Sequence, residues 1–188
     1  MKKITIMSLA LVAGVATAVV AAGFLVADHQ PRQVRAQWKN IYRTPGGLVA
    51  GADLIVVANH VAAVPGRIAG EGEDATPFTD NTFAIESVLR GDHNGSELVM
   101  EQTGGILPDG AVFDINDGGL YAPGATYLLF LKSKGDGTYY LINHQARYRV
   151  EDGILEGVDP TDPVVARFHG LPLDAGQRVI EKRVRVIE

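Results

Sequence analysis

The stretch Tyr127-Leu-Leu-Phe-Leu131 decides the fold class of this chain. Five consecutive apolar residues leave no polar face, so the pattern predicts a central β-strand that is buried on both sides. A second run, Asp53-Leu-Ile-Val-Val-Ala58, is rich in β-branched residues and predicts another buried strand. Strands of this kind need hydrogen-bonding neighbours, and the chain is therefore predicted to be mainly β.

The flanking sequence supplies those neighbours as short segments separated by turns. Residues 82–90 and 97–103 are predicted strands. The dipeptide Asn94-Gly95 between them is typical of a tight hairpin, because both residues tolerate positive φ. The remaining predicted strands are 138–142, 146–150 and 154–155.

Five to six short strands followed by one helix predict a small OB-like barrel, closed or partly open, over residues 46–160. A β-sandwich is the alternative. Residues 161–188 are predicted to be a C-terminal helical segment, with a helical turn near Phe168 and a last helix capped by Asp174. Pro45-Gly46-Gly47 is expected to break the chain before the barrel.

Residues 1–27 predict the location of the protein. After Lys2 and Lys3, residues 4–27 carry no charge, and about 20 apolar residues suffice to cross a bilayer as a helix. Two interpretations stay open: an uncleaved transmembrane anchor, or a signal peptide cleaved after a small-residue site such as Ala16-Thr17-Ala18. The first places a single-pass protein in the cell membrane with its domain outside the cytoplasm, and the second predicts secretion. A buried helix of a soluble protein is a third interpretation.

Residues 28–45 are expected to be a tether. Four basic residues follow one another at intervals of three or four, which would align them on one face of a helix lying at the membrane surface, with Trp38 among them. An ordinary linker explains the spacing equally well. The basic residues are Arg32, Arg35, Lys39 and Arg43.

Charge and cysteine content exclude several classes of function. The chain has a net charge of −5, so nucleic-acid binding through general electrostatics is not expected. It contains no cysteine, which excludes disulfides and thiolate metal ligands.

Two loops are the expected contact elements: a long mobile loop at 65–80 and a glycine-rich excursion at 104–124. The first carries an acidic patch that suits a basic or cationic partner, namely Glu71, Glu73 and Asp74. The second carries acidic residues whose oxygens suit either local turn formation or calcium, namely Asp109, Asp114 and Asp117. No other cofactor is expected.

No catalytic motif is present in the sequence. The five histidines lack metal-ligand spacing, and no serine lies in a Gly-x-Ser-x-Gly elbow. Either His60 or His144 could meet an aspartate once the chain folds. A pair of carboxylates assembled in space would make the protein a hydrolase of envelope polymers, and this stays the alternative to a non-catalytic role.

Four phrases resemble a loose group of exported bacterial proteins of unassigned function, whose fold is similar to netrin-like domains and tissue inhibitors of metalloproteinases. The resemblance covers residues 48–155 and rests on strand-and-turn phrases: Thr82–Gly91, Gln102–Gly105, Pro123–Leu131 and Tyr139–Val150. It implies an OB-like fold. Those inhibitors place an N-terminal cysteine on the protease zinc, and this chain has none, so no functional residue is carried over.

These patterns together predict an exported or membrane-anchored, non-catalytic binding or accessory module of the bacterial cell envelope. Its partner is expected to be a protein or another envelope component.

Overall fold

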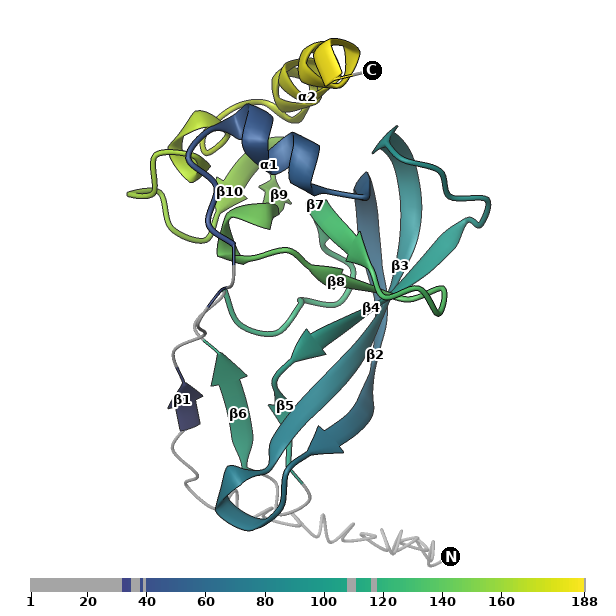
Figure 1. Cartoon of the computed structure of the whole chain (residues 1–188), viewed down its shortest axis with the longest axis vertical. Coiled ribbons are helices and arrows are strands. Elements are labelled where there is room, and N and C mark those ends of the chain that lie inside the picture. Colours follow the sequence, from purple (N-terminus) through teal and green to yellow (C-terminus); the bar gives the residue numbers. More distant parts are fainter. Residues whose placement is uncertain (1–31, 35–37, 39, 108–110, 116–117, 188) are drawn as a thin grey trace, which may run out of the picture.

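The computed structural model describes residues 32–34, 38, 40–107, 111–115 and 118–187 of the 188-residue chain. The prediction of a mainly β protein is confirmed (Figure 1). The strands are β1 (Arg32–Val34), β2 (Leu54–Ala69), β3 (Thr76–Arg90), β4 (Glu97–Thr103), β5 (Gly105–Ile106), β6 (Val112–Ile115), β7 (Thr126–Ser133), β8 (Tyr139–Leu141), β9 (Arg147–Glu151) and β10 (Ile154–Gly157). The helices are α1 (Pro45–Gly51), α2 (Leu173–Ile187) and the 3₁₀ turns η1 (Gly72–Asp74), η2 (His144–Ala146) and η3 (Val165–Arg167).

Most strands belong to one large mixed sheet with the order β10-β9-β7-β2-β3-β4-β8. One edge of β7 pairs with β2, and its other edge pairs first with β9 and then with β8. Because β8 also pairs in parallel with β4, hydrogen-bonded neighbours follow one another in a ring: β7, β2, β3, β4, β8 and back to β7. A small second sheet, β1-β6-β5, lies beside the far half of β2 and β3 (Figure 1).

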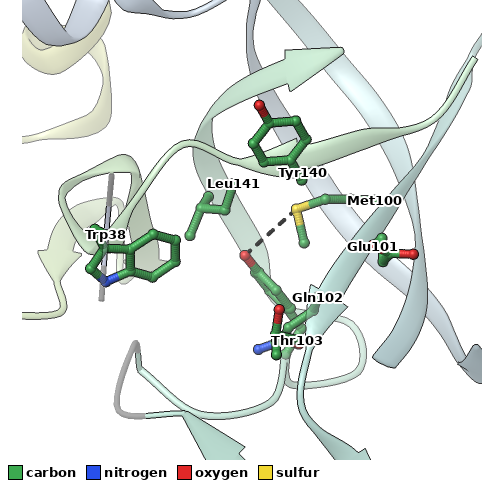
Figure 2. Close-up of a pocket in the computed structure, with 8 residues that line it drawn as sticks. Trp38, Met100, Glu101, Gln102, Thr103, Tyr140 and Leu141 are labelled. Carbon is green, nitrogen blue, oxygen red and sulfur yellow. Dashed lines mark hydrogen bonds between the residues drawn. The ribbon is translucent and has the colours of Figure 1, made fainter. Parts of the chain in front are cut away.

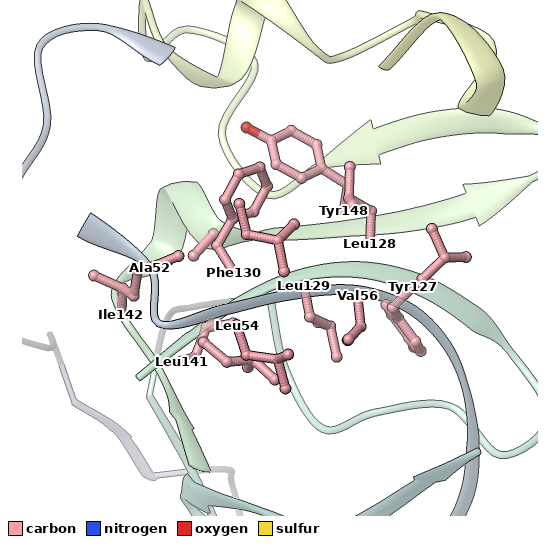
Figure 3. Close-up of a cluster of buried hydrophobic side chains, with 14 of the residues drawn as sticks. Ala52, Leu54, Val56, Tyr127, Leu128, Leu129, Phe130, Leu141, Ile142 and Tyr148 are labelled. Carbon is pink, nitrogen blue, oxygen red and sulfur yellow. The ribbon is translucent and has the colours of Figure 1, made fainter. Parts of the chain in front are cut away.

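The apolar run at 127–131 is buried on both faces, as its sequence predicts (Figure 3). On one side, the Phe130 ring packs 5.8 Å from Phe168 and 6.2 Å from Tyr148, measured between ring centroids. The hydroxyl of Tyr148 has no hydrogen-bond partner among the described residues, and burial raises the pKa of that hydroxyl far above its ordinary value. Phe168 belongs to the C-terminal segment, which therefore packs directly on the sheet.

The expected mobile loop at 65–80 is wrong, because most of it is β-structure. β2 continues to Ala69 and β3 begins at Thr76, so only a short turn separates them, and Gly70 enters that turn with a φ of +81°. Every second side chain of β3 is buried from Pro77 to Phe83, which is the period of a strand with one inward face. Pro65 and Gly66 fall at a register shift, which is how a strand accommodates them. We call residues 61–82 the hairpin arm.

The predicted hairpin of strands 82–90 and 97–103 is confirmed, because β3 and β4 pair antiparallel, but Asn94-Gly95 does not form its tight turn. The β3–β4 ladder ends at the pair Ala84–Glu97, while β3 runs on to Arg90 beside β2. In this connection the left-handed residue is Gly91, with a φ of +81°. β3 extends beyond the end of its pairing with β4 because it is still paired with β2, where Ile55 lies opposite Arg90.

Residues 44–51 begin the globular part with a helix where the sequence suggested a break. Pro45 is at the first turn of α1, where a missing N–H costs nothing, and the Thr44 hydroxyl accepts a hydrogen bond from the Gly47 N–H at 3.0 Å. Upstream, Arg32–Val34 is extended and pairs with β6, so this part of the tether is not helical. Arg35 and Lys39 lie outside the described residues, as does the predicted leader at 1–27.

The C-terminal helical segment contains the predicted turn, η3, and the predicted last helix, α2. Asp174 does not cap α2, because the helix already begins at Leu173. Asp174 instead lies in the first turn and pairs with Arg178 at 2.7 Å. No helix in the described part of the chain combines the length and the apolar character that crossing a membrane requires.

Candidate functional site

A pocket of about 150 Å³ opens where β4 and β8 separate (Figure 2). The two strands pair only at Met100–Tyr139 and Glu101–Tyr140. Beyond Glu101, β4 runs on to Thr103 while β8 ends at Leu141, and the space between them is left unfilled. The pocket therefore results from a parallel pairing that is only two residues long.

The walls of the pocket come from four separate segments. Trp38, from the tether, faces the strand residues of β4 across the opening, and Tyr140 and Leu141 contribute from β8 (Figure 2). Tyr121 also lines the pocket, and its hydroxyl donates to the Met100 sulfur at 3.8 Å. Trp38 is half-buried and Tyr140 is 43% exposed, so aromatic faces are available to a ligand.

The polar side of the pocket is formed by Glu101, Gln102 and Thr103. The Glu101 carboxylate accepts two hydrogen bonds from Arg67, at 3.0 and 3.1 Å, and pairs with Lys134 at 2.9 Å. The Arg67 guanidinium also stacks on the Phe78 ring at 3.7 Å. Glu101 thereby links the pocket to the hairpin arm and to the turn at residues 134–137.

The hydrogen bonds from Arg67 hold the pKa of Glu101 below its ordinary value, outweighing burial, and Lys134 adds to this effect. A carboxyl group with a lower pKa in the folded than in the unfolded chain stabilises the fold above its unfolded pKa. This stabilisation is lost as the pH falls through the folded value.

We therefore expect Glu101→Gln to lower the free energy of unfolding by about 1–2 kcal/mol at pH 7. The difference from the wild type should shrink below pH 4 and vanish when Glu101 is protonated in both states. Urea unfolding at pH 7 and pH 3 measures it, with the exposed Glu71→Gln as a control. A difference that is independent of pH would contradict this account of Glu101.

Next to the pocket, the buried polar side chains of His60, Asn81 and Gln102 form a row across the base of the arm. The Gln102 side chain donates to the Gly119 carbonyl at 2.9 Å, and Asn81 lies between Gln102 and His60. His60 is 1% exposed; its Nε2 is 3.1 Å from the Asn81 Oδ1, while its Nδ1 has no hydrogen-bond partner among the described residues. From the sequence, an aspartate is one possible partner of His60. The structure places the Asn81 side chain there instead.

Arg147 fixes the loop at residues 119–121, which lies next to these buried polar side chains. Its guanidinium donates to the carbonyl oxygens of Gly119 and Leu120, at 2.6 and 3.4 Å, and stacks 3.9 Å from the Tyr121 ring centroid. Neither Arg147 nor Trp38 is singled out as a binding residue by sequence, because their proximity to Tyr121 arises only when distant segments come together.

The structure places the predicted acidic patch at the tip of the hairpin arm. Glu71, which precedes η1, and Asp74, the last residue of η1, are exposed, and Glu73 lies between them within η1. Asp114 lies on β6, in the other sheet, so the two predicted acidic groups are on different elements. Asp109 and Asp117 lie outside the described residues.

His144 does meet an aspartate, as considered from the sequence: its Nε2 is 3.7 Å from the Asp162 carboxylate. Burial opposes ionisation of Asp162, but hydrogen bonds from Gln145, Val164 and Val165 outweigh it and lower the pKa. A general acid needs the opposite shift. Within the described ranges, no group of three or more histidine, aspartate or glutamate side chains is placed to hold a metal ion.

No protein-family model matches this chain, and no curated protein matches it.

Proposed function

We propose that the protein is an exported or membrane-anchored, non-catalytic binding module of the cell envelope that docks a basic protein partner through its hairpin arm. The ring of strand pairings supports an OB-like barrel as its framework. The uncharged stretch at 4–27 supports anchoring in the membrane or export by a signal peptide. The observation that carries the proposal is the exposed apolar surface of the arm.

Exposed apolar side chains follow one another along the far half of β2. Residues 61–65 are all exposed, and the largest apolar side chains, Val61, Val64 and Ile68, are 51%, 54% and 48% exposed. Large apolar side chains gathered on one element, rather than scattered singly, are typical of an interaction surface. Glu71 and Asp74 add negative charge at its end, which favours a basic partner.

The arm is fastened at its base and is therefore suited to present this surface. Arg67 pairs with Glu101, and the Thr79 hydroxyl donates to the Gly104 carbonyl at 2.8 Å. A surface held in place before binding loses less conformational entropy on association than a mobile loop. The net charge of −5 makes nucleic acid an unsuitable partner.

Site-specific crosslinking tests the proposal. A photo-crosslinking amino acid is introduced at Val64, and at Val186 on α2 as a control, since Val186 is 82% exposed. In intact host cells, we expect one envelope protein to be crosslinked from position 64 and not from position 186. The crosslink should weaken when Glu71→Gln and Asp74→Asn are combined.

Equal crosslinking from both positions, or none from position 64, would overturn the assignment of the arm. A crosslink that is unchanged in the Glu71→Gln/Asp74→Asn variant would overturn the basic character of the partner.

A further inference from the structure

We propose that the pocket between Trp38 and β4 is a saccharide site that takes one neutral pyranose ring. This inference does not depend on the hairpin arm, because none of the residues that line the pocket belongs to the arm. It rests on the arrangement of aromatic faces and polar groups around the opening (Figure 2).

The aromatic walls match one side of a sugar ring. A pyranose presents a face of C–H groups and an edge of hydroxyl groups. Trp38 and Tyr140 provide partly exposed aromatic surface on which such a face can stack, and Leu141 and Met100 complete the apolar lining. Binding sites of this kind combine apolar walls with a few placed polar groups.

Hydrogen-bonding groups line the opposite side. Glu101, Gln102 and Thr103 border the pocket; the Gln102 side chain is already hydrogen-bonded to Gly119, which leaves the Thr103 hydroxyl and the Glu101 carboxylate for a ligand. The edge of β4 that faces β8 also has no paired residue beyond Glu101 in the described part of the chain. Backbone and side-chain groups on this edge can therefore accept or donate hydrogen bonds to ring hydroxyls.

The charges around the pocket favour a neutral ligand over a cation. Aromatic pockets also bind quaternary ammonium groups, but such sites profit from net negative charge. Here the Glu101 carboxylate is already paired with both Arg67 and Lys134, so it is not free to pair with a further cation. A neutral ring needs no free carboxylate.

The size of the pocket limits the ligand to one ring. A volume of about 150 Å³ is well below the range that encloses a drug-sized molecule, about 300–1,000 Å³. The opening leaves room for the ring to belong to a longer chain, whose other units would remain in solvent.

Trp38 is the only tryptophan of the chain, so its fluorescence reports directly on this pocket. The full-length protein in detergent micelles is titrated with a β-1,4-linked tetramer of N-acetylglucosamine, and separately with choline. We expect a saturable change in tryptophan emission with the saccharide and at least tenfold weaker binding of choline. Tyr140→Ala should weaken saccharide binding at least tenfold, whereas Val88→Ala, at an exposed position on β3, should leave it unchanged.

Calorimetry with Trp38→Phe gives a second readout that does not use fluorescence, and it should show weakened binding by a protein whose thermal unfolding is unchanged. The absence of saturable saccharide binding by the wild-type protein would overturn the proposal. Tighter binding of choline would replace the saccharide by a cationic ligand. Because the arm variant Glu71→Gln/Asp74→Asn is expected to keep its saccharide affinity, failure of the arm proposal and failure of the pocket proposal are distinguishable.

Discussion

Replacing Gln145 by leucine is expected to lower the free energy of unfolding by about 3–5 kcal/mol, because this side chain joins three segments of the chain. Gln145 is fully buried, and its amide oxygen accepts from the Tyr42 N–H at 2.9 Å. Its amide nitrogen donates to the Tyr42 carbonyl at 3.0 Å and to the Asp162 carboxylate at 2.9 Å. Leucine fills a similar volume but leaves these groups without partners, and each buried group left unpaired costs about 1–3 kcal/mol.

Urea unfolding of the purified protein, followed by circular dichroism, measures this loss. Gln177→Leu is the matched control, since Gln177 lies on α2 and makes one long hydrogen bond, at 3.4 Å, to Ser87. We expect the control to change the unfolding free energy by less than about 0.5 kcal/mol. Equal effects of the two substitutions would show that Gln145 does not hold the segments together.

The second large effect is expected at Gly91, where alanine should cost about 3 kcal/mol or more. Gly91 follows β3 with a φ of +81°, and a Cβ atom there would collide with the backbone carbonyl oxygen of Asp53. That carbonyl belongs to the chain entering β2, and Asp53 is itself held by Lys132 at 2.6 Å and by the Ser133 N–H at 3.0 Å. The atom that the added methyl group would meet is therefore a backbone oxygen, and it cannot move without disturbing β2.

Gly135→Ala separates the two causes of this loss. Gly135 has a similar φ, +84°, but a Cβ atom added there would have open space around it, with no neighbouring atom within 4 Å. Its alanine variant should therefore show only the cost of the left-handed backbone, about 1–2 kcal/mol. Thermal unfolding of both variants measures the difference, and similar melting temperatures would show that Asp53 gives way to the added methyl group.

Local sequence is sufficient wherever the pattern is unambiguous. The apolar run at 127–131 predicts a strand buried on both faces, because no arrangement of five large apolar residues in a thin sheet leaves one face polar. The turn between the predicted strands 146–150 and 154–155 is also local: it falls at Asp152-Gly153, a pair of residue types that tolerates the positive φ both adopt here. These features depend on neighbours within a few positions.

The errors arise where local composition competes with strand pairing. Glycine, proline and acidic residues between 65 and 80 suggest a loop, but pairing of Val64 with Asp80 and of Ile68 with Pro77 extends the hairpin through them. Asn94-Gly95 suggests a tight turn, but the length of β2 determines where β3 ends. In both cases long-range hydrogen bonds outweigh local preference.

The pocket could not be predicted for a different reason. The sequence around Trp38 indicates a tether and that around Tyr140 a strand, and nothing in their spacing indicates that they lie on one opening. The same holds for Gln145, which is more than 100 positions from Tyr42. Contacts of this kind follow from the completed fold rather than from any segment.

The interrupted edge of β2 has a consequence for self-association at high protein concentration. Beyond His60, this edge pairs with no other strand in the described ranges, and long apolar edges are where copies of one protein can join into fibrils. Here two register shifts and Pro65 break the regular spacing of its backbone groups. The exposed apolar surface of the arm is thus kept from serving as a template for a fibril, even where many copies of the protein are close together.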